Sequence, residues 1–283
     1  MRDFCEALFD PDVAFLRYAL IAGLLASVAF GIVGSYVVVR RISYLAGAIS
    51  HSTLGGIGAA LYAQGVLGWQ WCHPMYGAVV AALLAAIVIG LVSLYAKQRE
   101  DTVIGAIWAM GMAIGLIFIF RTPGYTDAMS YLVGSILLTT RHDLYLVAGL
   151  DVLVVGLGIF FHNKLLAVCF DEEFTELRGV RVKLYYLLLL CLTALTIVLL
   201  VRVVGIIMVI ALLTLPAAVA GHFARKLWHM MALAVLFCMV FVVAGLQISY
   251  TAELHSGPVI VVVAGAFYLL VVVCRQLWRW RAA

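Results

Sequence analysis

Nine long apolar runs, separated by short charged or turn-rich breaks, constrain the fold of this 283-residue chain more than any other feature. Only 11% of the residues are charged, whereas a soluble domain carries about 25%. About 20 apolar residues are enough for a helix to cross the hydrocarbon core of a bilayer. The runs exclude a single water-soluble fold and predict an all-α polytopic membrane protein, with one transmembrane domain over residues 1–283. The predicted spans cover residues 13–39, 45–66, 75–96, 102–120, 143–161, 184–201, 203–221, 227–247 and 258–274.

The distribution of the 18 Lys and Arg residues among the predicted loops indicates the orientation of the chain. Basic loops stay on the cytoplasmic side of a membrane. With the loop from Lys164 to Lys183 in the cytoplasm, strict alternation puts thirteen basic residues inside and five outside, and the opposite orientation inverts this ratio. We therefore expect the N-terminus outside and the C-terminus in the cytoplasm. The acidic start of the chain is the wrong polarity for a cleavable secretion signal, and the net charge of +4 gives no reason to expect a nucleic-acid partner.

Residues 128–140 form an apolar stretch of 13 residues, which is too short to cross a bilayer as a helix. We expect a helix that either lies at the membrane surface or enters the membrane and returns on the same side. Half-crossing backbone survives at membrane depth only where protein buries it or water reaches it. The second alternative would therefore indicate a transport pathway, and the first would not.

His51 is the most informative residue, because it places an ionisable side chain inside a predicted span, between Ser50 and Ser52. Ionisable groups within a membrane usually face the interior of a helix bundle or a water-filled path, and imidazole is a common ligand of divalent transition metals. Gly47, His51, Gly55 and Gly58 recur at steps of three and four residues, so one helix face can approach another backbone closely. The alternative is that His51 donates one interhelical hydrogen bond and serves packing only.

The longest basic loop contains a second pattern, between Phe170 and Gly179. Apolar side chains recur there at helical spacing, acidic residues fill the first turn, and an Arg–Gly pair ends the segment. A short amphipathic helix of this kind can dock into a groove on a soluble partner. Lying on the lipid surface is the alternative, but surface helices are usually basic. The predicted helix comprises Phe170, Asp171, Glu172, Glu173, Phe174, Glu176, Leu177, Arg178 and Gly179.

The remaining candidate groups and motifs narrow the function by what they exclude. The six cysteines are scattered singly, without the CxxC pairs of zinc or thiol redox sites. The chain contains no GxxxxGK[ST] phosphate-binding loop, so it does not bind ATP through a P-loop. It also contains no HExxH and no GxSxG, which argues against an intramembrane metalloprotease or a serine hydrolase of the usual patterns. Five further histidines lie in or beside predicted loops, where they are either solvated or meet an incoming metal ion: His73, His142, His222, His229 and His255.

An ordered series of short segments along the chain resembles the permease subunits of bacterial manganese, zinc and iron ABC importers. The series is Gly34–Arg41 (GSYVVVRR), Ile49–Ser52 (ISHS), Asp127–Gly134 (DAMSYLVG), Phe174–Gly179, Arg202–Met208 (RVVGIIM), Leu215–Ala218 (LPAA) and Ser256–Pro258 (SGP). The resemblance covers nearly the whole chain. It implies the transmembrane fold of the cobalamin importer, a type II ABC importer, and a homodimer in the lipid of the bacterial inner membrane. It also implies a separate pair of cytoplasmic ATPase subunits and an extracytoplasmic metal-binding protein.

For individual residues, the resemblance places a metal ligand of the translocation path at His51, with Ser50 as an additional candidate. The aspartate that precedes this histidine in the family falls at Gly47, which has no ligand side chain. The segment near 170–179 corresponds to the coupling helix, which carries motion from the ATPase to the spans.

These observations together predict the permease subunit of an ATP-driven importer of a divalent transition metal ion (zinc, manganese or iron), without enzymatic activity or an intrinsic cofactor of its own. ATP would be bound by the partner subunit. Two alternatives remain open at this stage. A gradient-driven carrier of metal or small solutes would need carboxylates within the spans, and only Asp151 comes close. A membrane scaffold without transport activity would give no reason for His51 or for the docking helix.

Overall fold

The computed structural model describes residues 14–95, 100–123, 134 and 136–282. This part of the chain contains nine helices of 18 to 27 residues, as the sequence predicts. The long helices are α2 (Ala14–Val39), α3 (Tyr44–Gly65), α4 (Pro74–Tyr95), α5 (Glu100–Arg121), α7 (Arg141–Phe160), α10 (Val182–Val204), α11 (Ile206–Phe223), α12 (Leu227–Thr251) and α13 (Ser256–Ala282). The short ones are η2 (Ile136–Leu138), α8 (His162–Phe170) and α9 (Glu172–Leu177).

Eight of the nine long helices are apolar and long enough to cross a membrane, and α3 is the exception. Helix α3 carries Gly, Ser, Thr and His where the others carry branched aliphatic residues. Its polar groups are tolerated because the surrounding helices α4, α5, α10 and α11 bury most of its length. The one long helix that does not qualify as a membrane span by its composition is therefore held inside the protein.

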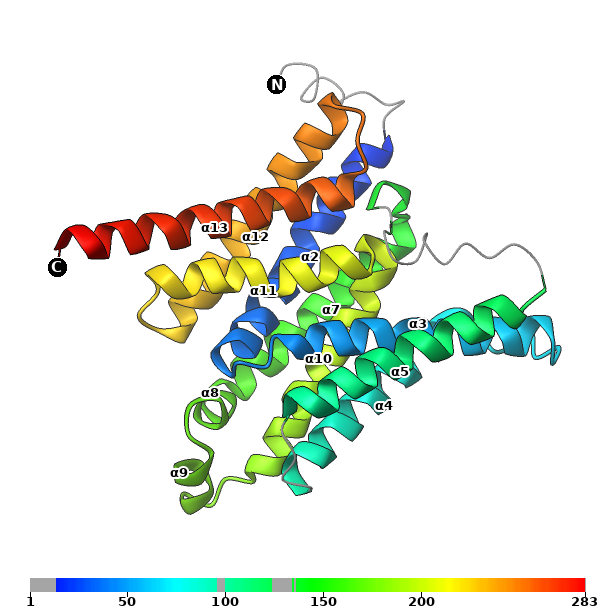
Figure 1. Cartoon of the computed structure of the whole chain (residues 1–283), viewed down its shortest axis with the longest axis horizontal. Helices are drawn as coiled ribbons and strands as arrows, with labels where there is room; N and C mark the ends of the chain where they lie inside the picture. The colour runs from blue at the N-terminus through cyan, green and yellow to red at the C-terminus, as the bar shows by residue number, and fades with distance from the viewer. Residues whose placement is uncertain (1–13, 96–99, 124–133, 135, 283) are drawn as a thin grey trace.

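The helices are arranged around α2, which packs against α7, α11 and α12. Figure 1 shows α3, α4 and α5 together on one side of this centre and α11, α12 and α13 on the other. Helices α8 and α9 lie at the end of the bundle where α2 finishes (Figure 1). The same end holds the turn after α11, because Trp228 at the start of α12 stacks on His162 of α8, with ring centroids 4.1 Å apart. Arg275 of α13 donates a hydrogen bond to the carbonyl oxygen of His222 before this turn over 2.6 Å.

Small residues bring α3 into close contact with α5, as their spacing predicts. A methyl group added at Gly55 or Gly58 would collide with the backbone carbonyl of Gly111 or Gly115 on α5. Without such side chains the two backbones approach directly, which is how helices pack tightly in membranes. The predicted shared face of α3 is therefore confirmed, and its neighbour is α5.

The chain breaks between α10 and α11 at Gly205, three residues after the break that the sequence placed at Arg202. Gly205 has φ +84° and ψ 162°, a conformation that is essentially restricted to glycine. Gly134, with φ +61°, packs directly against this glycine. The earlier position was wrong because a charged residue marks a hydropathy break, whereas the helix ends where the backbone leaves the helical region.

The predicted helix over residues 128–140 lies mostly outside the described residues. Within its described part, Ile136–Leu138 form one 3-10 turn rather than an α-helix. Thr140 then caps α7, because its side chain accepts a hydrogen bond from the backbone N–H of Asp143 and the Asp143 carboxylate accepts one from the Thr140 N–H.

Candidate functional site

His51 lies on the face of α3 that packs against α5. Its imidazole stacks on the indole of Trp108, with ring centroids 5.0 Å apart and ring planes inclined by 20°. The side chain is half-buried, and its Nδ1 is buried without a hydrogen-bond partner among the described residues. The stacking on Trp108 holds the plane of the imidazole ring.

Trp108 also explains why glycine occupies position 47. A Cβ atom at Gly47 would collide with the six-membered ring of Trp108. The aspartate that the family resemblance places at position 47 therefore could not be accommodated unless the indole moved. The space of that carboxylate is taken by the ring that orients His51.

The hydroxyl groups beside His51 divide into satisfied and unsatisfied ones. Ser52 donates to the carbonyl of Ala48 over 2.8 Å, and Thr53 donates to the carbonyl of Ser50 over 2.6 Å. The hydroxyl of Ser50 is fully buried and has no partner among the described residues. Successive helical residues point about 100° apart, so Ser50 and His51 do not share one helix face. Ser50 is available to a polar group, but on a different side of α3.

The described part of the chain holds no group of three or more His, Cys, Asp or Glu side chains that could coordinate a metal ion. Transition-metal sites in proteins usually need three or four ligands.

The predicted docking helix exists, but it is shorter than expected. Phe170 ends α8, Asp171 caps α9 by accepting a hydrogen bond from the N–H of Phe174 over 3.0 Å, and Arg178 and Gly179 follow the helix. Gly179 has φ +76° and so stops the helix as predicted. Three large apolar side chains, Phe170, Phe174 and Leu177, are 70%, 51% and 87% exposed.

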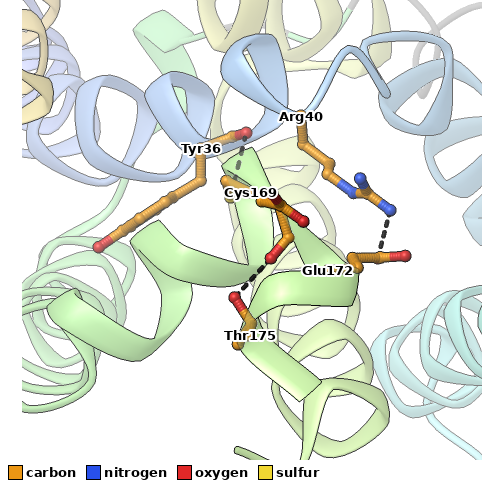
Figure 2. A network of polar contacts seen from close by, with 6 residues as sticks. Tyr36, Arg40, Cys169, Glu172 and Thr175 are labelled. Carbon is orange, nitrogen blue, oxygen red and sulfur yellow. Dashed lines mark hydrogen bonds and ion pairs between the residues drawn. The ribbon is translucent and has the colours of Figure 1, made fainter. Parts of the chain in front are cut away.

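This segment is fixed to the C-terminal end of α2 by several contacts. Figure 2 shows Arg40 reaching Glu172 of α9 and Cys169 of α8 beneath the carbonyl of Tyr36. The hydroxyl of Tyr36 lies 3.0 Å from Nδ1 of His162 at the start of α8. Burial lowers the pKa of His162, so its neutral ring can accept this hydrogen bond. Burial also raises the pKa of the Cys169 thiol to about 12, which keeps it protonated.

Three residues around His51 and in the α8–α9 segment make contacts that the sequence alone does not indicate. Trp108 and His162 each lie in or beside an apolar run, and Arg40 reads only as part of a basic loop. Their roles depend on partners that are distant in sequence: His51, Tyr36 and Glu172.

The five histidines that the sequence places in or beside loops do not lie next to His51. His142 and His255 are exposed. His73 lies in the α3–α4 loop, and its Nδ1 accepts a hydrogen bond from the backbone N–H of Met75 in α4. His222 contacts Arg275, and His229 lines a groove with Arg225 and Lys226.

Comparison with known proteins places this architecture in a family. The model of the ABC 3 transport family matches residues 12–275. The chain belongs to this family. A Chlamydia pneumoniae protein named "Probable metal transport system membrane protein" is 43% identical, with 88% of this chain and 85% of the relative covered. The manganese transport system membrane protein MntC of Listeria monocytogenes is 33% identical over 94% of this chain and 92% of the relative.

Two solved structures share the fold. PsaBC from Streptococcus pneumoniae, in complex with a Fab, matches with a TM-score of 0.81 and 31% identity over 95% of this chain and 94% of the other. An inward-facing metal-chelate type ABC transporter matches with a TM-score of 0.72 and 12% identity over 93% and 89%. The predicted all-helical polytopic fold is confirmed. As a membrane subunit of an ABC transporter, the chain relies on a separate subunit for ATP hydrolysis.

Proposed function

We propose that this chain is the membrane permease of a bacterial ABC importer for a divalent transition metal ion. The observation that carries the proposal is the match of almost the whole chain to the ABC 3 transport family, together with relatives that are named for metal or manganese transport. Among zinc, manganese and iron, the names of the relatives favour manganese. The ion is cargo, and the chain has no cofactor of its own in this proposal.

His51 is the residue proposed to meet the ion within the membrane. It is half-buried, its Nδ1 has no described partner, and Trp108 holds its ring in one plane. A single neutral imidazole binds a divalent ion weakly, which favours release over trapping. A second copy of the chain in a homodimer would bring a second His51 and could complete the path.

The segment near 170–179 is proposed as the coupling helix that docks on the ATPase. Phe174 and Leu177 present exposed apolar side chains beside the acidic first turn of α9, and helices of this kind dock into grooves on soluble partners. In the orientation that the basic loops favour, α8 and α9 lie in the cytoplasm and the N-terminus lies outside. The α3–α4 loop is then on the outer side, where an extracytoplasmic metal-binding protein would deliver the ion. The membrane is then the bacterial inner membrane.

Manganese uptake into proteoliposomes tests the proposal. The permease is reconstituted with its cognate ATPase subunit, and accumulation of radioactive manganese is measured with ATP, without ATP, and with an imposed proton gradient alone. We expect accumulation only when the ATPase and ATP are both present. Uptake driven by the proton gradient without ATP would overturn the proposal in favour of a secondary carrier. Parallel measurements with zinc and iron establish the preferred ion.

A further inference from the structure

The turn that connects α2 to α3 is tied to α9 by an ion pair. The guanidinium of Arg40, the first residue after α2, contacts the carboxylate of Glu172, the first residue of α9 (Figure 2). The two side chains are 21% and 35% exposed. The rest of α9 packs on α8 and α10. Glu172 is therefore the residue through which α9 reaches the α2–α3 turn.

Both ends of this contact are held by helix caps. Helix α2 ends with the N–H of Ile42 donating to the carbonyl of Val37 and the N–H of Arg41 donating to that of Val38, with Arg41 at φ +64°. This is the hydrogen-bond pattern of a Schellman cap. On the other side, Glu172 directly follows Asp171, which caps the start of α9 by accepting a hydrogen bond from the N–H of Phe174 over 3.0 Å. The ion pair therefore joins two capped helix ends.

The α2–α3 turn leads directly into the helix that bears His51. Helix α3 begins at Tyr44, and His51 lies seven residues further, about 10 Å along the helix axis. The backbone from Tyr44 to His51 is one continuous α-helix. A shift of the turn therefore reaches His51.

The environment of Arg40 fits a contact that changes between two arrangements. Its guanidinium also lies over the ring of Tyr186, with Cζ 5.4 Å from the ring centroid, so the cation keeps a partner if Glu172 moves. Its Nε is buried and has no hydrogen-bond partner within the part of the chain that the structure describes. A carboxylate can bind a guanidinium through two parallel hydrogen bonds, so a small displacement of Glu172 could satisfy Nε as well.

We propose that the Arg40–Glu172 ion pair is a positioning contact that transmits movement of α9 to the α2–α3 turn and so to His51. The inference rests on the proposed function, because it takes α9 as the segment that the ATPase moves. Arg40 and Glu172 bind neither the ion nor ATP in this mechanism. Their role is to make the α2–α3 turn move together with α9.

The charge of the pair provides the test. In proteoliposomes with the cognate ATPase, manganese ions imported per ATP hydrolysed are compared for Glu172→Gln, Arg40→Glu, and the exchanged pair Arg40→Glu with Glu172→Arg. We expect the single variants to lower this ratio by about five-fold, the size of effect that a partly exposed ion pair can have, and the exchanged pair to restore most of it. Glu253→Gln removes an exposed carboxylate from the connection between α12 and α13, outside the coupling segment, and should leave the ratio unchanged. Co-purification of the ATPase should be the same in all variants.

A distance measurement tests the same contact without reference to the ion. Spin labels at Tyr44 and Glu176, both exposed, report the separation of α3 and α9 in the assembled transporter. We expect this distance to stay constant when ATP binds to the wild-type complex and to change in the Glu172→Gln complex. A constant distance in both, an unchanged import ratio in Glu172→Gln, or loss of ATPase binding in that variant would overturn the inference. Failure of the wild type to import any metal while the distances behave as expected would overturn the proposed function alone.

Discussion

At the scale of single residues, the contact between α3 and α5 determines what His51 can do. Trp108 stacks on the imidazole and at the same time fills the space beside Gly47. A carboxylate at position 47 and an indole at position 108 are therefore mutually exclusive in this packing. The chain has the indole, so no carboxylate stands one turn before His51, where the family resemblance places an aspartate.

Gly47→Ala should destabilise the protein because the added methyl group meets the ring of Trp108. Forcing an extra methyl into a packed interior typically costs about 1–3 kcal/mol. The measurement is thermal unfolding of the purified protein in detergent. Gly105→Ala is the matched control, since nothing lies within 4 Å of its added Cβ on α5, and it should leave the unfolding temperature unchanged or raise it. Equal stability of both variants would show that the indole moves aside freely.

His51→Ala should reduce ATP-driven manganese uptake by at least about tenfold, because loss of even a supporting partner of a metal ligand usually costs 10–100-fold. The unfolding temperature should change much less, since His51 is only half-buried. His255→Ala, an exposed loop variant, should retain full uptake. Unchanged uptake by His51→Ala would leave His51 with a packing role only.

At the scale of the elements, the backbone conformation of Gly205 separates α10 from α11, so that the two runs form two helices instead of one kinked helix. Gly205→Ala should lower stability, because a backbone at φ +84° and ψ 162° costs a residue with a side chain about 1–3 kcal/mol. Thermal unfolding measures the effect, and Gly156→Ala on α7, with open space around its Cβ, serves as the control. If both variants unfold at the same temperature, the break does not depend on this glycine.

Helix α9 provides the second prediction at this scale. Leu177→Asp should weaken binding of the ATPase, because Leu177 is 87% exposed and its loss removes a docking contact without opening the core. The amount of ATPase that co-purifies with the permease measures the effect. Leu254→Asp changes a side chain that is 56% exposed at the opposite end of the bundle, and it should bind the ATPase normally. Normal binding by Leu177→Asp would remove the docking assignment of α9.

The elements were largely predictable from the sequence because hydropathy and helix capping are local properties. The nine runs became nine long helices, and Gly179 ends the docking segment as its position indicated. The sites were less predictable because they depend on pairing between distant segments. His51 was identified from its own chemistry, but its neighbour Trp108 could be found only once α5 was placed against α3. The same holds for Arg40 and Glu172, which are 132 residues apart.

At the scale of the whole molecule, the two ends of the bundle differ in their contacts. One end brings together Arg40, α8 and α9, and also the turn after α11 with Arg275. The other end brings Gly134 against Gly205 and carries the stacked pair Trp69 and Trp71. If all nine long helices cross the membrane, successive connections alternate between its two sides, which produces these two groups of contacts. Two of the basic residues that the sequence assigned to the cytoplasm, Arg40 and Arg275, make contacts at the first of these ends, and the orientation of the molecule stays a prediction.

This grouping leads to a prediction about the orientation of the whole molecule. Cys72 lies half-exposed in the loop between α3 and α4, and Glu176 lies exposed on α9 at the other end. Two variants, each retaining one cysteine, at position 72 or as Glu176→Cys, are treated in intact spheroplasts with a maleimide that does not cross membranes. Because basic loops remain in the cytoplasm, Cys72 should react at once and the cysteine at position 176 only after permeabilisation. The reverse pattern would invert the orientation and, since a soluble ATPase works in the cytoplasm, would also make α9 inaccessible to it. The labelling therefore tests the positive charge distribution and the docking role together.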